Sequence, residues 1–297
     1  MFQPRNATSD DGPGIPSIAI SFGVLQFVGG LALSGILCTV LFAQNVKRSM
    51  TWISFCIAWI FSCISFNLLF FAGQQTGPIE PNFGLCVVQG ALIHSVPVLQ
   101  AAVSLALVIH TWAFVQSTVT GHPYLSRRTN LIFLLIFPWV LSLSLFVGFL
   151  VFGIQNPSTV HREKTGSYCN IFYKRIPSKV TSGTAGVLVL ISLIFEVSLG
   201  RILYRHWRLL SGKAAYLTMA IRVMTFTFVG ALVLCLAIVY FASRARSEIL
   251  LAIIPIIAVV VFGTQADLRR AWMFWKNAPP PVPVKGENKV TQSQSIV

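Results

Sequence analysis

Seven long apolar runs, separated by short polar connections, constrain the fold of this sequence more than any other feature. An α-helix rises 1.5 Å per residue, so about 20 mainly apolar residues cross a hydrocarbon core about 30 Å thick. Because lipid offers no partner to backbone N–H and C=O groups, runs of this length are expected to be helical. They predict spans at 17–43, 52–72, 86–114, 131–153, 182–204, 218–241 and 248–264, the last being the shortest. We therefore expect an all-α membrane protein, folded as a seven-transmembrane helix bundle.

The composition argues against a soluble globular protein and against a nucleic-acid-binding protein. Hydrophobic residues make up 55% of the chain and charged residues only 10%, whereas charged residues make up about 25% of a typical soluble domain. The net charge of +14 is carried by short basic clusters between the apolar runs. Such clusters orient a membrane protein, so we expect the lipid bilayer, and no nucleic acid, as a partner.

The distribution of the basic residues predicts the orientation of the chain in the plasma membrane. Of the 22 Lys and Arg residues, 14 lie on the side that includes the C-terminal tail and 8 on the side that includes the N-terminus. Because basic residues favour the cytoplasmic side, the N-terminus is expected outside the cell and the C-terminus inside. The glycosylation signal at Asn6 then faces the outside, where glycosylation occurs.

Four parts of the chain follow from this topology. Residues 1–16 are expected to form an extracellular tail and residues 17–264 the transmembrane domain. Residues 265–277 have apolar side chains on one helical face and basic ones on the other, which predicts a short amphipathic eighth helix along the inner leaflet. Residues 278–297 begin with a run of prolines and are polar, which predicts a disordered cytoplasmic tail.

Two of the six cysteines face the oxidising compartment in this topology. Cys86 lies at the outer end of the third span and Cys169 in the second outer loop, whereas the other four lie within spans. We expect Cys86 and Cys169 to form a disulfide that holds the loop over the bundle; two free thiols are the alternative. No zinc-binding spacing occurs among the cysteines, so no metal is expected.

The third span carries a polar stripe on an otherwise apolar helix. At 100° per residue the stripe falls within an arc of about 140°, and it comprises Cys86, Gln89, His94, Pro97, Gln100, Ser104 and Thr111. Because an unpaired polar group facing lipid is costly, the stripe is expected to face the bundle interior. The predicted ligand-binding residues are His94, Pro97, Gln100 and Ser104, with Asn67 of the second span. Alternatively, these groups only form hydrogen bonds with neighbouring helices.

Glu196 is the only acidic residue well inside a predicted span. An ionisable group within the hydrocarbon is unfavourable enough to predict a functional role. Its candidate partners are Arg222, Arg201 and His110, and we predict an activation switch formed by Glu196, Arg222 and His110 in the cytoplasmic half. A direct ligand contact and a protonated, inert carboxyl group are the alternatives.

Signatures of an enzyme or a resident cofactor are missing from the sequence. It contains no H-E-x-x-H, no G-x-S-x-G and no glycine-rich phosphate loop. The predicted seventh span has no lysine that could hold retinal. We therefore expect no catalytic activity and no cofactor.

Local motifs at the start of the third span and the end of the seventh add to this architecture. The third span opens with Cys86-Val87-Val88-Gln89-Gly90, and the seventh ends with Phe262-Gly263-Thr264-Gln265, followed by Asp267, Leu268, Arg269 and Trp272. With the predicted architecture of residues 17–276, these segments resemble G-protein-coupled receptors. The first segment is similar to the cAMP-receptor-like and secretin-like branches, and the second resembles orphan fungal receptors. The rhodopsin-like motifs are absent, since His110-Thr111-Trp112 replaces D-R-Y and Ile254-Pro255-Ile256 replaces N-P-x-x-Y.

The resemblance implies a cell-surface receptor that binds an extracellular ligand and signals to a cytoplasmic heterotrimeric G protein. It implies contacts with the G protein or the inner leaflet for Arg127, Arg128, Arg201, Arg205, Arg208 and Lys213; topology alone would also account for these basic residues. A membrane transporter or lipid-translocating exporter is the alternative function, although the sequence has neither internal repeats nor paired broken helices.

Overall fold

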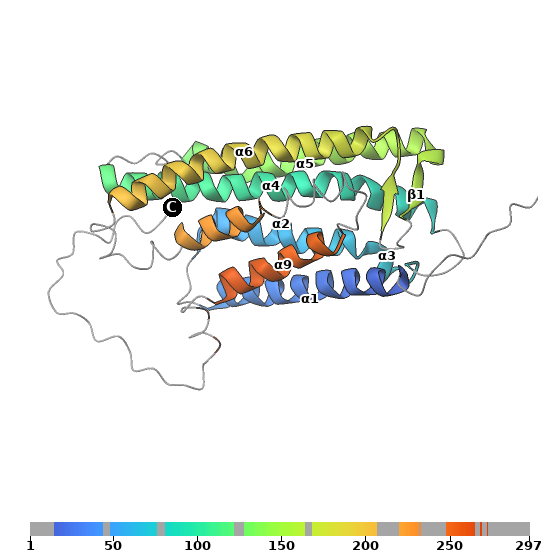
Figure 1. Cartoon of the computed structure of the whole chain (residues 1–297), viewed down its shortest axis with the longest axis horizontal. Coiled ribbons are helices and arrows are strands. Elements are labelled where there is room, and N and C mark those ends of the chain that lie inside the picture. The colour runs from blue at the N-terminus through green and yellow to red at the C-terminus, as the bar shows by residue number, and fades with distance from the viewer. Residues whose placement is uncertain are drawn as a thin grey trace, which may run out of the picture.

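Nearly parallel helices form an elongated bundle in the computed structural model (Figure 1). The structure describes residues 15–43, 48–75, 81–121, 128–163, 168–206, 220–230, 232, 248–264, 268 and 272, with the backbone alone at 15–18, 128 and 248–251. Its labelled helices are α1 (Ile15–Phe42), α2 (Met50–Phe66), α3 (Leu68–Phe71), α4 (Phe83–Thr120), α5 (Arg128–Gln155), α6 (Ile176–Arg205) and α9 (Glu248–Gly263). A further helix lies at Ala220–Gly230. The short 3-10 helix η1 (Pro157–Thr159) leads into strands β1 (Val160–Arg162) and β2 (Cys169–Ile171).

Length and composition identify the membrane-spanning helices. Four segments are long and apolar enough to cross a bilayer: Ala19–Phe42, Phe83–Thr120, Thr129–Gln155 and Ile176–Arg205. Within the described residues, three shorter apolar helices accompany them: Met50–Phe66, Ala220–Gly230 and Ala252–Gly263. The prediction of a helical membrane protein is confirmed.

α4 is the central helix of the bundle. It packs against α2, α5 and α6, while α1 packs against α2 and α9. At 38 residues it is longer than the predicted span at both ends. It begins at the cap residue Asn82, whose side chain accepts a hydrogen bond from the Gly84 N–H, and ends at Gly121, which has the left-handed φ of 72°. Apolarity alone cannot locate these ends, because capping residues rather than lipid define them.

The second predicted span is divided by Asn67. α2 ends at Phe66, and the four-residue α3 continues after Asn67, which has φ −89° and ψ 7°. The Asn67 side chain donates to the Cys63 carbonyl oxygen (3.1 Å). Asparagine side chains compete with the backbone for hydrogen bonds in this way, which accounts for the end of α2 here.

An antiparallel hairpin, absent from the sequence-based prediction, covers one end of the bundle. Val160 of β1 pairs with Ile171 of β2, and Arg162 pairs with Cys169. Each strand has only three residues, too few for an alternating pattern to emerge from the sequence. We call this end, which carries the hairpin and Cys86, the disulfide end; Figure 1 shows it beside the label β1.

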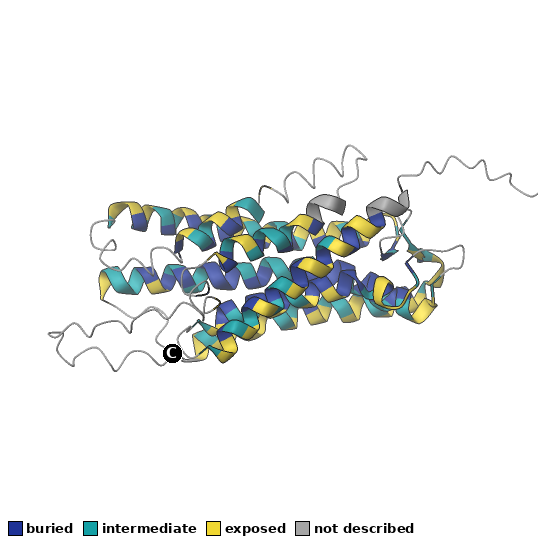
Figure 2. Ribbon diagram, turned by 90° about the horizontal axis from the view of Figure 1, so that it is seen from below, coloured by how far each residue is buried: buried dark blue, intermediate teal, exposed yellow. Residues whose placement is uncertain are grey.

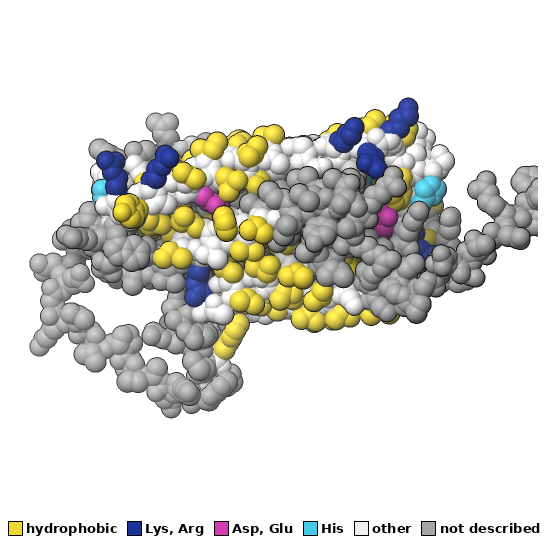
Figure 3. Space-filling view, in the orientation of Figure 1, with side chains coloured by type: hydrophobic (Ala, Val, Ile, Leu, Met, Phe, Trp, Pro, Cys, Tyr) yellow, Lys and Arg dark blue, Asp and Glu magenta, His cyan; other side chains and the backbone are white. Residues whose placement is uncertain are grey.

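The outer faces of the helices are apolar. α5 exposes a row of large hydrophobic side chains that includes Phe133 (65% exposed), Val140 (57%) and Leu143 (60%). Exposed residues lie on the outward faces and buried ones between the helices (Figure 2). On the face in Figure 3, hydrophobic side chains cover the flanks, and the described Lys and Arg side chains lie mainly toward the two ends. An exposed apolar surface of this extent indicates a lipid surrounding.

Candidate functional site

The predicted disulfide joins α4 to the hairpin. Cys86 and Cys169 are bonded, with their Cα atoms 5.2 Å apart, which confirms the predicted pairing. Cys86 is buried on α4 and Cys169 is buried in β2 of the hairpin. Residues 83 positions apart in the chain are thereby fixed together at this end of the bundle.

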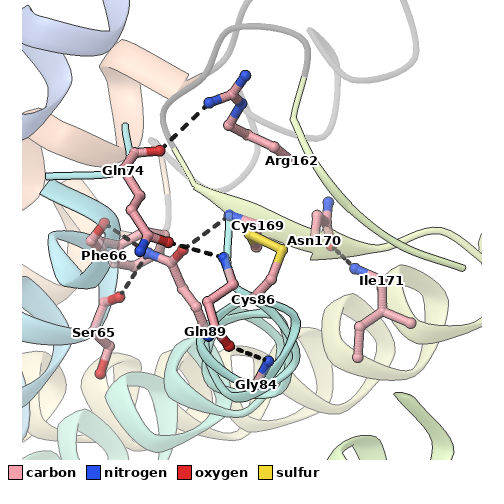
Figure 4. The surroundings of a disulfide bond; sticks show 11 residues. Ser65, Phe66, Gln74, Gly84, Cys86, Gln89, Arg162, Cys169, Asn170 and Ile171 are labelled. Atoms are coloured by element: carbon pink, nitrogen blue, oxygen red, sulfur yellow. Dashed lines mark hydrogen bonds between the residues drawn. A yellow bond between two sulfur atoms is a disulfide. The ribbon is translucent and has the colours of Figure 1, made fainter. Parts of the chain in front are cut away.

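Gln89 reinforces the same junction, one turn from Cys86 on α4. Its amide nitrogen donates to the carbonyl oxygens of Ser65 and Phe66 at the end of α2, at 3.2 Å each. Its amide oxygen accepts from the Cys169 backbone N–H at 2.9 Å (Figure 4). Gln89 thus connects α2, α4 and β2. The sequence placed Gln89 on the polar stripe but gave no sign of this role.

Close packing holds the hairpin down on the bundle. Tyr168 lies with its ring 5.8 Å from that of Phe22 and 5.9 Å from that of Phe66. A methyl group added at Gly90 of α4 would lie 3.0 Å from Ile171. The hairpin therefore closes against α1, α2 and α4 rather than standing away from them.

A cavity of about 130 Å³ lies midway along the bundle. Side chains from α2, α4, α6, the helix Ala220–Gly230 and α9 line it. Most of these side chains are apolar, and the polar ones are Gln100, Ser104, Ser192, Glu196 and Thr227. The cavity brings residues from distant parts of the sequence to one place in the membrane-spanning region.

Three of the five predicted ligand-binding residues line this cavity, namely Pro97, Gln100 and Ser104. Gln100 donates to the Ser62 hydroxyl at 2.8 Å, and the Ser104 hydroxyl donates to the Gln100 carbonyl at 2.7 Å. Gln100 thus bonds a neighbouring helix, whereas Ser104 bonds its own helix.

His94 and Asn67 lie elsewhere. His94 is buried closer to the disulfide end, where the Thr181 hydroxyl donates to its backbone carbonyl at 2.9 Å. The His94 ring lies 5.1 Å from that of Phe149, so this residue joins α4, α5 and α6. Asn67 is bound to Cys63 at the end of α2. Neither residue is among the described residues that line the cavity.

Glu196 lines the cavity from α6, and the described hydrogen bonds of Arg222 lead to the end of α9. The carboxyl group lies beside the Thr227 side chain, and its Oε1 atom is buried without a partner among the described residues. Arg222 instead donates to the Val261 carbonyl (2.6 Å) and to Thr264 at the end of α9. Carbonyl groups in the last turn of a helix lack internal partners, which makes them good acceptors for arginine.

The other predicted partners of Glu196 are also separate from it. Arg201 is exposed farther along α6, and His110 is half-buried on α4. Neither residue bonds to the Glu196 Oε1 atom, which has no partner among the described residues. The three-residue switch therefore stays a prediction.

Two aromatic residues of the cavity were not predicted. Trp59 of α2 and Phe226 line it, with their rings 5.7 Å apart in an edge-to-face arrangement. The Trp59 indole N–H is buried without a partner among the described residues. In an apolar helix a tryptophan looks like any other core residue, so only the packing of α2 against its neighbours identifies it.

The opposite end of the bundle carries part of the predicted basic surface. Arg201 and Arg205 are exposed there on α6. Outside the described residues lie Asn6, Arg127, Arg208 and Lys213, whereas Arg128 is described by its backbone alone. Within the predicted eighth helix, Leu268 is buried, and the Trp272 indole donates to the Thr39 hydroxyl of α1 at 2.9 Å.

Searches for related proteins returned no matching protein family and no matching curated protein.

Proposed function

We propose that the chain is a seven-transmembrane receptor that binds a small extracellular ligand and signals to a cytoplasmic heterotrimeric G protein. In this proposal the four long apolar helices and the three shorter ones all cross the membrane. The disulfide end faces outside the cell, as the distribution of Lys and Arg favours. The hairpin then covers the outer end of the bundle, and Arg201 and Arg205 face the cytoplasm.

The cavity at mid-membrane is the observation that carries this proposal. It lies where five helices meet, and it includes Pro97, Gln100 and Ser104 of the polar stripe together with Glu196. Largely apolar cavities with a few polar groups are typical of small-molecule sites. A ligand there would contact five helices at once.

Signalling requires that the ligand bind one arrangement of these helices better than another. The cavity is bordered by Glu196 of α6 and by Phe226 and Thr227 of the neighbouring helix. Arg222 lies one turn from Phe226 toward the cytoplasmic end, and its hydrogen bonds connect the helix Ala220–Gly230 to α9. A ligand that displaces Phe226 or Thr227 would shift this helix and its hydrogen bonds to α9. The shift would change the cytoplasmic surface that binds the G protein.

Nucleotide exchange on co-expressed Gα subunits tests the proposal. A library of small molecules would be screened for stimulated GTPγS uptake in membranes that contain the chain and a panel of Gα subunits. Ser104→Leu fills the cavity and should abolish any stimulation. Ser182→Leu, at an exposed serine of α6 that also bonds its own helix, should leave the stimulation unchanged. Absence of exchange with every Gα, together with measurable substrate flux, would reject the receptor.

A transporter or lipid translocator is the second candidate, favoured by one observation. An apolar groove of about 330 Å³ lies between α5 and α6, lined by residues that include Phe149, Phe152, Pro177 and Val180. A groove of this kind suits an acyl chain. Flux of a fluorescent phospholipid across proteoliposomes that collapses in Glu196→Gln would support this function over the receptor.

A further inference from the structure

Two buried polar groups at the central cavity have no partner within the described protein. They are the Glu196 Oε1 atom and the Trp59 indole N–H. The two side chains are only 6% and 5% exposed, and both line the cavity, from α6 and α2 respectively. Buried polar groups are nearly always hydrogen-bonded in folded proteins. An acceptor and a donor left unpaired at one cavity therefore point to a bound molecule that completes both.

We propose that the cavity binds a small, uncharged, mainly apolar molecule that carries a hydroxyl group, such as an alcohol or a phenol. The hydroxyl hydrogen is donated to Glu196, and the hydroxyl oxygen accepts the indole N–H of Trp59. This inference rests on the proposed function and names the class of ligand for that site.

The pairing of a donor with an acceptor selects the hydroxyl group over other polar groups. An ammonium ion has donors only, so it would leave the Trp59 N–H unpaired. A carboxylate has acceptors only and would be repelled by an ionised Glu196. A pure hydrocarbon would leave both protein groups unsatisfied.

The remaining lining explains why the ligand needs an apolar body. Apart from its few polar groups, the cavity is bordered by side chains such as Ala101, Val189, Leu193 and Ile254. A buried water requires two to four polar partners, so water molecules along this wall would lack them. At about 130 Å³, the cavity is close in size to an apolar cavity of about 150 Å³ that admits one benzene ring.

The two unpaired groups are linked through the helix Ala220–Gly230. The Phe226 ring packs 5.7 Å from that of Trp59, and the next residue, Thr227, contacts the Glu196 carboxyl. Thr227 also donates to the Val223 carbonyl of its own helix at 2.7 Å. Thr227 therefore donates within its own helix, and the Glu196 Oε1 atom has no donor among the described residues.

The test uses a series of probes with one ring and different polar groups. Benzyl alcohol, benzylamine, benzoate and toluene would be titrated by calorimetry into the full chain in lipid nanodiscs, and empty nanodiscs would correct for partition into lipid. We expect saturable binding of benzyl alcohol that is at least about fivefold tighter than that of the other three, the factor for one neutral hydrogen bond.

Four variants connect this binding to the two unpaired groups. Trp59→Phe, which removes the N–H and keeps a ring, should weaken benzyl alcohol binding about fivefold, and Glu196→Met about tenfold. Glu196→Gln retains an acceptor and should stay within about twofold of the parent. Trp52→Phe is the matched control, since Trp52 of α2 also has a buried indole N–H without a partner among the described residues but does not line the cavity; it should not change binding.

Three results would overturn the inference: no saturable binding of benzyl alcohol, tighter binding of benzylamine, or equal effects of Trp59→Phe and Trp52→Phe. These results are distinct from failure of the receptor proposal. Binding with the expected pattern but without nucleotide exchange would reject signalling and keep the ligand class. Ligand-driven exchange that is unchanged by Trp59→Phe and Glu196→Met would support the receptor and reject the ligand class.

Discussion

Gln89 pairs three buried backbone groups that no helix or strand satisfies by itself. They are the carbonyl groups of Ser65 and Phe66 and the N–H of Cys169. The Gln89 side chain is fully buried. A side chain that lacks an amide would leave all three groups without their partner.

Gln89→Leu is therefore expected to destabilise the protein by about 2–4 kcal/mol, because unpaired buried polar groups are costly. Thermal unfolding of the purified chain in detergent would measure the change. Gln155→Leu, at an exposed position on α5, is the control and should leave the unfolding temperature nearly unchanged. Equal unfolding temperatures for the two variants would contradict the role assigned to Gln89.

At this scale the sequence predicted residue types better than partners. Pro97, Gln100 and Ser104 could be placed at an interior site because lipid excludes unpaired polar groups from the outer face. The contacts of Arg222 with the end of α9 were not predicted, because the rotation of its helix decides which groups the guanidinium meets. Trp59 was missed for the same reason.

At the scale of helices, α1 and α9 approach closely at Gly29. A methyl group at this position would lie 2.7 Å from Cβ of Pro255 in α9. Small residues allow such close contacts between membrane helices. At Gly35, six residues farther along α1, an added methyl group would meet no described atom within 4 Å other than its own helix backbone and chain neighbours.

This contrast gives a matched pair of variants. Gly29→Ala should destabilise the bundle by about 1–3 kcal/mol through overpacking. Gly35→Ala should be neutral or stabilise by up to about 1 kcal/mol, because alanine favours a helix over glycine. Thermal unfolding in the same detergent compares the two, and a larger loss in Gly35→Ala would refute the close contact.

The link between α4 and the hairpin predicts the effect of removing the disulfide. Cys86→Ser and Cys169→Ser should lose surface expression to a similar degree, since each breaks the same bond, with a destabilisation of about 3–5 kcal/mol. Surface labelling of intact cells measures this, and Cys38→Ser, at an exposed free cysteine of α1, is the control. Unequal losses in the first two variants would show that one of the cysteines has a separate role.

Elements were predictable where the solvent dictates them. Lipid requires long apolar helices, so the described helices overlap the predicted spans. The strands of the hairpin and the interruption at Asn67 depend on a few local hydrogen bonds. Such bonds leave no periodic pattern in the sequence.

For the whole molecule, the proposed topology places the two ends of the chain in different compartments. Protease added to intact cells should leave an epitope tag after Val297 intact and should remove it after permeabilisation. Glycosidase treatment should shift the mobility of the parent chain but not that of Asn6→Gln. A tag cleaved on intact cells would exclude the proposed seven-span arrangement.

The 38 residues of α4 correspond to a rod about 57 Å long, nearly twice the thickness of the hydrocarbon core. Such a rod must tilt strongly or project from the membrane. Its disulfide end is tied to the hairpin by Cys86 and Gln89. For a rod of this length, each degree of tilt shifts one end relative to the other by about 1 Å. A small movement of the hairpin that tilts α4 would therefore displace Gly121 at the opposite end of the helix, on the other side of the bilayer.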